Sequence, residues 1–306
     1  MPIKIPLSLP AAEILEKENI FVMDTERADT QDIRPLKIGI LNLMPTKIVT
    51  ETQLMRLLSN TPLQIDITLL TTETYTARNT DKSHLDSFYK TFNEVKNVKF
   101  DGLIITGAPL EFMEFREVSY WNELCEIIDW ANKNVFSTLY VCWGAFAGLY
   151  HNHGIQKYPL SVKASGIFRH HSLVPEHPLL RGFDEYFDAP HSRFSYVSKQ
   201  DIQNTGKLLI LAESNEVGVY LAASHDMRQI YVTGHPEYDA DTLKKEYERD
   251  FAKGMNPVIP HNYFPDDNPQ NTPKNTWRSH AHLLYSNWLN YCVYQTTPYN
   301  IEEIGR

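Results

Sequence analysis

The residues with the clearest chemical potential begin at Cys142, a thiol that directly follows an apolar run. Residues 135–141 have the composition of a buried β-strand, and residues 143–148 include small side chains that allow a helix to begin after a tight turn. Such a turn exposes the side chain at its tip, and the helix N-terminus stabilises a thiolate while offering N–H groups to an oxyanion. The pattern predicts a nucleophile elbow; the alternative is a buried structural cysteine.

A second pair of reactive side chains, His235 and Glu237, follows another apolar run at residues 229–233. Because the two are separated by one residue, the carboxylate can reach the imidazole from behind and orient it as a general base. A His-x-Glu pair alone is weak evidence, but its position after a strand and Gly234 strengthens it. With Cys142, the pair predicts a triad for covalent catalysis.

The elements that must position this triad alternate between strand and helix patterns. Apolar β-rich runs predict strands at residues 36–44, 65–70, 100–105, 135–141, 208–212, 217–222 and 229–233. Helical spacing predicts helices at residues 11–18, 46–58, 117–132, 241–253 and 277–293. This alternation predicts an α/β fold with a doubly wound, mostly parallel sheet and helices on both faces, and sites in such folds lie beyond the C-terminal strand ends.

The remaining segments have weaker patterns. Residues 71–97 are polar and threonine-rich, which suggests a loop or short helix near a functional rim. Residues 155–201 are rich in histidine, proline and aromatic side chains, with short strand-like pieces such as 166–170, and are expected to cross the edge of the sheet that carries the active site.

We predict an N-terminal lead-in segment, 1–34, followed by a single α/β domain, 35–306, that ends in the C-terminal helix.

Composition limits the classes of partner and compartment. The chain has 306 residues, 42% hydrophobic and 22% charged, and a formal net charge of −9 without a basic run. This balance favours a globular protein with a small-molecule partner over one that binds nucleic acid or an anionic membrane. Three widely spaced cysteines and an N-terminus without a signal-peptide pattern predict a cytoplasmic protein.

Several motifs together resemble a known family. The order Cys142-Trp143-Gly144 and, far downstream, a His-x-Glu pair resembles class I glutamine amidotransferases and implies their fold. A closer resemblance, over essentially the whole chain, is to the homoserine O-acyltransferases of methionine biosynthesis. Members of this family transfer a succinyl or an acetyl group to the hydroxyl oxygen of homoserine. It rests on the segments Asn42-Leu43-Met44-Pro45, Thr106-Gly107-Ala108-Pro109, Tyr140-Val141-Cys142-Trp143, Ala189-Pro190-His191-Ser192-Arg193 and Gly234-His235-Pro236-Glu237.

The resemblance implies a role for each triad member and for three further residues. It makes the thiol the acyl acceptor, the imidazole the general base and the carboxylate its partner, and it assigns substrate contacts to Lys163, Ser192 and Arg249. Arg249 offers a fork for the carboxylate of L-homoserine, Ser192 a hydrogen bond and Lys163 a cation. For Arg249, pairing with its acidic neighbours is the alternative.

Glu111 bears on the choice of acyl donor. The resemblance implies glycine here in succinyl-using members and glutamate in acetyl-using members. A carboxylate beside the acyl pocket would fill space and repel the succinyl carboxylate. We therefore predict acetyl-CoA as co-substrate and no bound cofactor, with homoserine O-succinyltransferase as the alternative function. The alternative role for Glu111 is only to start a helix after Pro109, where an acidic residue suits the helix dipole.

The oxyanion donors are expected to be backbone N–H groups of Trp143 and of the loop around Pro109. Because proline has no N–H, the second donor must come from Gly107, Ala108 or Leu110.

Tyr140 stands where glutaminases usually have glycine, which weakens a glutaminase interpretation without removing it. A non-catalytic scaffold is the remaining alternative.

The other histidines form closely spaced pairs without a complete set of metal ligands. They are His151 with His153, His170 with His171, and His280 with His282. On a helix, residues two apart face different directions, and no cysteine or carboxylate cluster completes a tetrahedral set, so we predict no metal. A homodimer is expected from the family resemblance alone.

Overall fold

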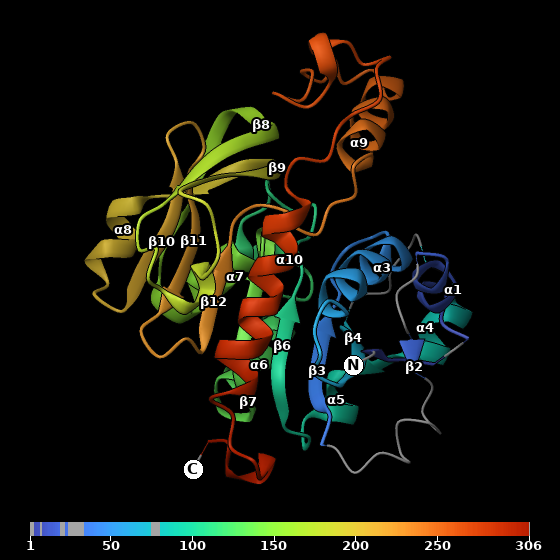
Figure 1. Cartoon of the computed structure of the whole chain (residues 1–306), viewed down its shortest axis with the longest axis vertical. Helices are drawn as coiled ribbons and strands as arrows, with labels where there is room; N and C mark the ends of the chain where they lie inside the picture. The colour runs from blue at the N-terminus through green and yellow to red at the C-terminus, as the bar shows by residue number, and fades with distance from the viewer. Residues whose placement is uncertain (1–2, 7, 19–21, 24–33, 75–79, 306) are drawn as a thin grey trace.

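The computed structural model describes residues 3–6, 8–18, 22–23, 34–74 and 80–305, and the strands among them form one 12-stranded sheet (Figure 1). The strand order is β2-β1-β4-β3-β6-β7-β12-β11-β10-β8-β9, with β5 also paired to β4. From β2 to β12 every pairing is parallel. These strands are β1 (Ile3–Lys4), β2 (Val22–Met23), β3 (Leu36–Leu41), β4 (Ile65–Thr71), β5 (Tyr89–Thr91), β6 (Phe100–Ile105), β7 (Val135–Val141) and β12 (Gln229–Val232).

Helices cover both faces of the parallel region, as predicted. One buried cluster joins the sheet to α1, α3 and α10, and a second joins its opposite face to α6 and α7. The described helices are α1 (Pro10–Lys17), α3 (Lys47–Leu58), α4 (Lys82–Phe88), α5 (Phe92–Val95), α6 (Trp121–Asn134), α7 (Trp143–His153), α8 (Lys199–Asn204), α9 (Thr242–Ala252) and α10 (Arg278–Asn287), which continues as a π-helix over Trp288–Tyr294.

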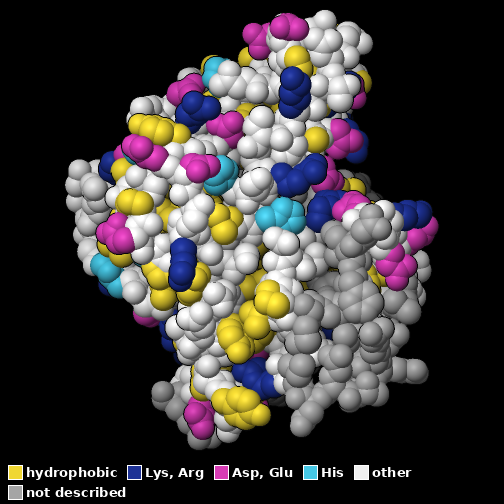
Figure 2. All heavy atoms as spheres, in the orientation of Figure 1, with side chains coloured by type: hydrophobic (Ala, Val, Ile, Leu, Met, Phe, Trp, Pro, Cys, Tyr) yellow, Lys and Arg dark blue, Asp and Glu magenta, His cyan; other side chains and the backbone are white. Residues whose placement is uncertain are grey.

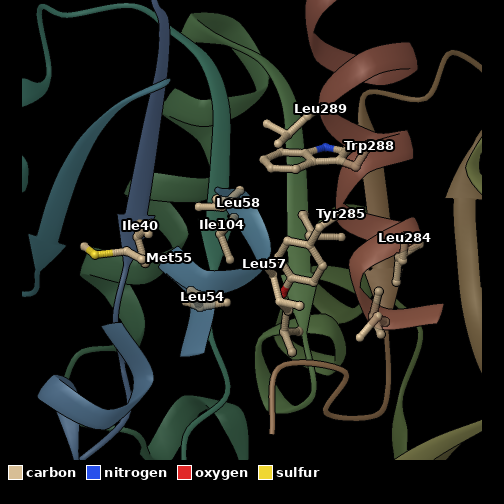
Figure 3. Packing of buried hydrophobic residues seen from close by; sticks show 14 of the residues in the cluster. Ile40, Leu54, Met55, Leu57, Leu58, Ile104, Leu284, Tyr285, Trp288 and Leu289 are labelled. Atoms are coloured by element: carbon tan, nitrogen blue, oxygen red, sulfur yellow. The ribbon is translucent and has the colours of Figure 1, made fainter. Parts of the chain in front are cut away.

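Figure 3 shows how the C-terminal helix is fixed against the sheet. Trp288 packs directly on β6, where a Cβ at Gly102 would lie 2.9 Å from the indole, so this close approach requires glycine. The indole N–H donates to Ser137 Oγ at 3.0 Å. Burial of an aromatic or aliphatic side chain contributes roughly 1.5–3 kcal/mol, which anchors the helix firmly.

The remainder of the sheet is antiparallel, which the sequence analysis did not predict. Strands β8 (Lys157–Ser172) and β9 (Tyr186–Val197) form a long hairpin, and β10 (Leu208–Ser214), β11 (Gly218–Ser224) and β12 pair antiparallel in turn. The short strand expected at residues 166–170 is therefore part of a 16-residue strand. The sheet as a whole is still mostly parallel.

Two other local predictions need correction. The strand predicted at residues 36–44 ends at Leu41. Asn42 N–H still donates to Leu70 O at 3.0 Å, and its side chain donates to Tyr89 Oη at 2.9 Å. The segment 71–97 carries α4, β5 and α5 rather than a plain loop, and residues 75–79 of it lie outside the described residues.

The described part of the lead-in segment joins the same sheet and core. β1 pairs with β4, while Ala11 and Leu15 of α1 are buried in the cluster that contains α3. Residues 1–2, 7, 19–21 and 24–33 lie outside the described residues. The domain boundary after residue 34 stays a prediction.

The described surface carries mixed charge. On the face shown in Figure 2, acidic and basic side chains are interspersed over the described residues, without a broad area of one sign. Among the described helices, none combines the length and the apolar composition needed to cross a membrane.

Candidate functional site

Cys142 lies at the turn between β7 and α7, as the elbow prediction requires. Its backbone adopts φ 51° and ψ −117°, a conformation that costs a non-glycine residue roughly 1–3 kcal/mol. The turn is held because Cys142 N–H donates to Val232 O at 2.7 Å and its carbonyl accepts from Ala145 N–H at 2.9 Å. Contrary to the exposure expected at the tip of such a turn, Cys142 is only 3% exposed.

Two glycines bring the thiol against the loop that follows β6. A Cβ at Gly144 would lie 2.6 Å from Thr106 O, so only glycine allows α7 to start this close to β6. A Cβ at Gly107 would lie 3.3 Å from Cys142 Cβ and 3.4 Å from His235 Cε1. Gly107 therefore contacts both the thiol-bearing residue and the imidazole.

His235 is placed beside Cys142 by the pairing of β12 with β7. Val232 lies opposite Val141 in the register, so the two chains leave the sheet side by side. His235 N–H donates to Pro190 O at 2.8 Å, which fixes the loop to β9. The ring nitrogen Nδ1 lies 2.7 Å from Glu237 Oε1, and both side chains are buried.

The local charges favour an imidazolium. Burial opposes that form, but the nearby Cys142 and Glu237 charges, with hydrogen bonds to both side chains, raise the pKa of His235 well above its ordinary value. A cationic imidazole next to a cysteine is the environment in which a thiol becomes a reactive thiolate. The geometry can therefore support attack by sulfur followed by proton transfer through the imidazole.

The loop after β6 carries Glu111 and two of the predicted oxyanion donors. Glu111 lies in a turn, because the next α-helix begins only at Trp121, so the alternative that it starts a helix is wrong. Burial raises the pKa of the Glu111 carboxyl, against the opposing charges of Lys163 and His235. The Glu111 carboxyl therefore lies within electrostatic reach of both Lys163 and His235.

The predicted backbone donors differ in availability. Trp143 is the first residue of α7, where helix geometry leaves the N–H without an intrahelical partner. Ala108 follows Gly107 beside the thiol, whereas Leu110 N–H already donates to Ala108 O at 2.9 Å. Leu110 is therefore the least suited of the three, and the other two stay predictions.

The three predicted substrate-binding residues come together around two carboxylates. Ser192 Oγ donates to Glu246 Oε2 at 2.5 Å, and Lys163 Nζ lies 3.5 Å from the same oxygen and 3.9 Å from Asp250 Oδ2. Arg249 donates to Asp250 through Nε at 2.8 Å and Nη2 at 2.7 Å. The structure thus links β8, β9 and α9 at one place, while the substrate-binding roles remain predictions.

Sequence reasoning missed two residues that connect this group to His235. Tyr238 stacks on the His235 ring with a centroid distance of 4.1 Å, and its hydroxyl donates to Glu246 Oε1 at 2.9 Å. The available signal was spacing, because Glu246 precedes Arg249 and Asp250 by three and four residues and so shares their helix face.

A cleft with a volume of about 970 Å³ lies against Glu237, lined by the loop after His235 and by α3 and α10. Glu237 and Tyr238 line it, but Cys142 does not. Glu237 Oε2 is buried without a partner among the described residues. The cleft therefore reaches the loop of Glu237 and Tyr238 without reaching Cys142.

The other cysteines and histidines fit structural roles. Burial raises the pKa of Cys125 to about 11 and that of Cys292 to about 12, which disfavours a thiolate at either. His151 pairs with Asp129 and His280 with Asp184. Within the described ranges, no three side chains of the metal-binding types gather into a group.

Comparison with known proteins identifies the family. The family model described as homoserine O-succinyltransferase matches residues 2–299. The chain belongs to this family. A homoserine O-acetyltransferase of Acetivibrio thermocellus is 60% identical over 99% of this chain and 100% of its own length. Enzymes of the same name from Petrotoga mobilis and Methanomassiliicoccus intestinalis are each 58% identical over 100% of this chain, and over 99% and 100% of their own lengths.

Solved structures confirm the class I glutamine amidotransferase-like fold. A glutamine amidotransferase from Thermotoga maritima matches with a TM-score of 0.53 and 9% identity, covering 84% of this chain and 98% of its own. One from Methylobacillus flagellatus gives 0.52 and 12%, covering 85% and 95%. At these identities the likeness concerns the fold alone.

Proposed function

We propose that this family member is a homoserine O-acetyltransferase that moves the acetyl group of acetyl-CoA to the γ-hydroxyl of L-homoserine. The observation that carries the proposal is full-length identity of 58–60% to enzymes named for this activity, in a chain with Cys142 beside a His235–Glu237 pair. The product would serve methionine biosynthesis, and we infer a cytoplasmic location and no bound cofactor.

The first half-reaction forms an acyl-enzyme. The Cys142 thiolate attacks the thioester carbonyl carbon of acetyl-CoA, a new C–S bond forms, and the C–S bond to CoA breaks when the tetrahedral oxyanion collapses. Backbone N–H groups of Trp143 and Ala108 are the proposed oxyanion donors. The departing CoA thiolate takes the proton from the His235 imidazolium.

The second half-reaction releases the product. Neutral His235, oriented by Glu237, takes the proton of the homoserine hydroxyl while its oxygen attacks the acetyl-enzyme carbonyl. The C–S bond to Cys142 breaks, and the thiolate and imidazolium are restored. The elevated pKa of His235 suits this exchange, since the imidazole carries the proton between the two steps.

The choice of acetyl over succinyl is assigned to Glu111. Its carboxylate is partly buried and within electrostatic reach of His235. The Glu111 carboxylate would repel the free carboxylate of a succinyl group, whereas an acetyl group carries no charge.

The test is product formation with a panel of acyl donors. Purified protein with homoserine and acetyl-, propionyl- or succinyl-CoA should give O-acetylhomoserine fastest. Ammonia release from glutamine, measured in parallel, should be absent. Glutamine hydrolysis without ester formation would contradict the proposal, and faster succinyl transfer would overturn the donor assignment alone.

A further inference from the structure

Arg193 of β9 is a charged side chain in the interior of the protein, with only 1% of its surface exposed. Its Nε donates to His191 Nδ1 at 3.1 Å, Nη1 donates to Ser195 O at 2.5 Å, and Nη2 donates to Val217 O at 2.6 Å. These acceptors are neutral, and within the described part of the chain no carboxylate pairs with the guanidinium. A buried charge is costly unless an opposite charge compensates it.

The hydrogen bonds show that the two histidines beside Arg193 cannot supply that opposite charge. Because arginine only donates, His191 must accept at Nδ1 and carry its proton on Nε2, which lies 3.0 Å from His170 Nε2. Burial and the charge of Arg193 lower the pKa of both imidazoles, that of His170 to about 3. Burial lowers the pKa of Arg193 itself to about 10, so the guanidinium is still a cation at neutral pH.

The negative charge that reaches Arg193 is that of the Cys142 thiolate, which opposes the effect of burial on the arginine. The guanidinium carbon lies 6.0 Å from the centre of the Phe146 ring, and Phe146 N–H donates to Cys142 O at 3.2 Å in the first turn of α7. The same strand holds the general base, since Pro190 O accepts from His235 N–H at 2.8 Å. Arg193 is therefore packed against the elbow that carries the thiol.

The other titratable groups near the thiol come from two loops. His235 and Tyr238, in the loop after β12, are both coupled to the charge of Cys142. Tyr238 stays neutral because burial raises the pKa of its hydroxyl well above its ordinary value. Glu237 is paired with His235, and Glu111, in the loop after β6, is also within electrostatic reach of that imidazole. Among these groups only His235 is a cation, and it becomes neutral when it protonates the departing CoA.

We propose that Arg193 is a positioning residue whose buried guanidinium stabilises the Cys142 thiolate, in addition to the imidazolium of His235. The inference rests on the proposed function, because attack on the acyl-CoA thioester requires the thiolate. Arginine does not exchange its proton during the reaction, so its charge is present in both half-reactions. The thiolate is stabilised both as the nucleophile of the first step and as the leaving group of the second.

The test follows the ultraviolet absorbance of the Cys142 thiolate as the pH is raised. The signal is the difference between each protein and the same protein carrying Cys142→Ala. Arg193→Gln removes the charge but keeps an amide donor, and the loss of a cation destabilises the thiolate but not the thiol. The midpoint of the titration should therefore move to higher pH by about one unit. At neutral pH, kcat/KM for acetyl transfer should fall by about 10-fold.

Two more variants separate the charge of Arg193 from its hydrogen bonds. Arg193→Lys keeps a cation but loses the fork that holds the two carbonyls, so its midpoint should stay close to that of wild-type protein. Arg193→Met removes both, and should shift the midpoint as Arg193→Gln does even if the glutamine variant does not fold. A purely structural arginine would give the same result with lysine as with glutamine.

Arg228 provides a matched control for a buried arginine bound to carbonyl groups. Its Nε donates to Phe136 O at 3.1 Å and its Nη2 to Val135 O at 3.0 Å, and its guanidinium carbon lies 5.9 Å from the Phe136 ring. These contacts are at the start of β7, roughly 20 Å along the strand from Cys142. Arg228→Gln should lower the free energy of unfolding, measured with urea, but leave the thiolate midpoint in place.

A midpoint that is unchanged in folded Arg193→Gln and Arg193→Met would overturn the inference. An equal shift in Arg193→Lys or in Arg228→Gln would overturn it as well. Failure of the proposed function would look different, since wild-type protein would then transfer no acetyl group while its thiolate titration is still measurable.

Discussion

Among the described residues, two buried imidazole–carboxylate pairs lie at the carboxyl edge of the parallel strands, and only one of them is next to a cysteine. His235 and Glu237 follow β12, while His84 of α4 pairs with Glu51 of α3, with Nε2 at 3.0 and 3.1 Å from the two carboxylate oxygens. Both histidines are less than 10% exposed. Burial and a carboxylate partner are therefore not sufficient to mark a catalytic histidine.

The difference lies in what surrounds each pair. Glu51 also accepts from Tyr89 Oη at 2.5 Å, and Tyr89 Oη accepts from Asn42, so this carboxylate is part of a closed structural network. Burial lowers the pKa of the adjacent Lys47 to about 8. In contrast, His235 Nδ1 lies 2.7 Å from Glu237 Oε1, and the His235 ring and Cys142 both lie against Gly107. A cysteine at the end of the neighbouring strand distinguishes the two pairs.

The largest expected effect separates the two histidines directly. His235→Asn should reduce kcat/KM for acetyl transfer by about 10²–10⁴-fold, the usual contribution of a general acid–base group. His84→Asn should leave activity within a few-fold but lower the free energy of unfolding by about 1–3 kcal/mol, because Glu51 loses a partner. Kinetics and urea unfolding of both variants check this; equal losses of activity would break the comparison.

The second effect concerns pH. The pKa of His235 is raised, so the imidazolium that gives its proton to the departing CoA is present below that pKa and is lost as the pH rises through it. Glu237→Gln removes one of the charges that raise this pKa, so the alkaline limb of CoA release without acceptor should move to lower pH, with a loss of rate of about 10-fold or more. Glu51→Gln should leave the limb in place. A limb unchanged in Glu237→Gln would contradict the assignment.

A smaller effect is expected in donor choice. Glu111→Gly removes a carboxyl group that lies within electrostatic reach of His235, so the preference for acetyl-CoA over succinyl-CoA should fall by about 10-fold. Competition between the two donors in one reaction measures the ratio. Glu114→Gly, in the same loop but exposed, is the control. An unchanged preference would remove Glu111 from donor selection.

The smallest effect compares the two tyrosines. Tyr238→Phe keeps the ring on His235 but loses the hydrogen bond to Glu246, so kcat/KM should fall by about 2- to 10-fold. Tyr89→Phe should leave activity unchanged and lower the free energy of unfolding by about 1–2 kcal/mol. Steady-state kinetics and denaturation distinguish these outcomes, and a larger activity loss for Tyr89 would contradict them.

The sequence predicted those parts of the molecule that depend on local patterns. Strands such as β6 and β7 are continuous apolar runs, and the elbow at Cys142 follows from a strand next to small residues, so their positions were predicted correctly. The antiparallel part of the sheet was not predicted, although the sequence contains a signal for it in the length of the connections. Only short connections join β10, β11 and β12, whereas parallel strands need crossovers of about a dozen residues or more.

The parts that could not be predicted depend on long-range contacts. Nothing in the local sequence indicates that Glu246 meets Ser192, 54 positions away, or that Tyr238 would bridge this contact to His235. Likewise, the pairing of His84 with Glu51 joins two helices, and neither segment resembles a His-x-Glu motif. Such contacts emerge only when the sheet order is known.

Acetyl trapping tests the central claim most directly. Protein incubated with acetyl-CoA and no acceptor, then digested and weighed by mass spectrometry, should carry one acetyl group on the peptide that contains Cys142 and release a matching amount of CoA. Addition of homoserine should discharge it, and Cys142→Ala should carry none. An unlabelled wild-type Cys142, or equal labelling of the alanine variant, would contradict the account.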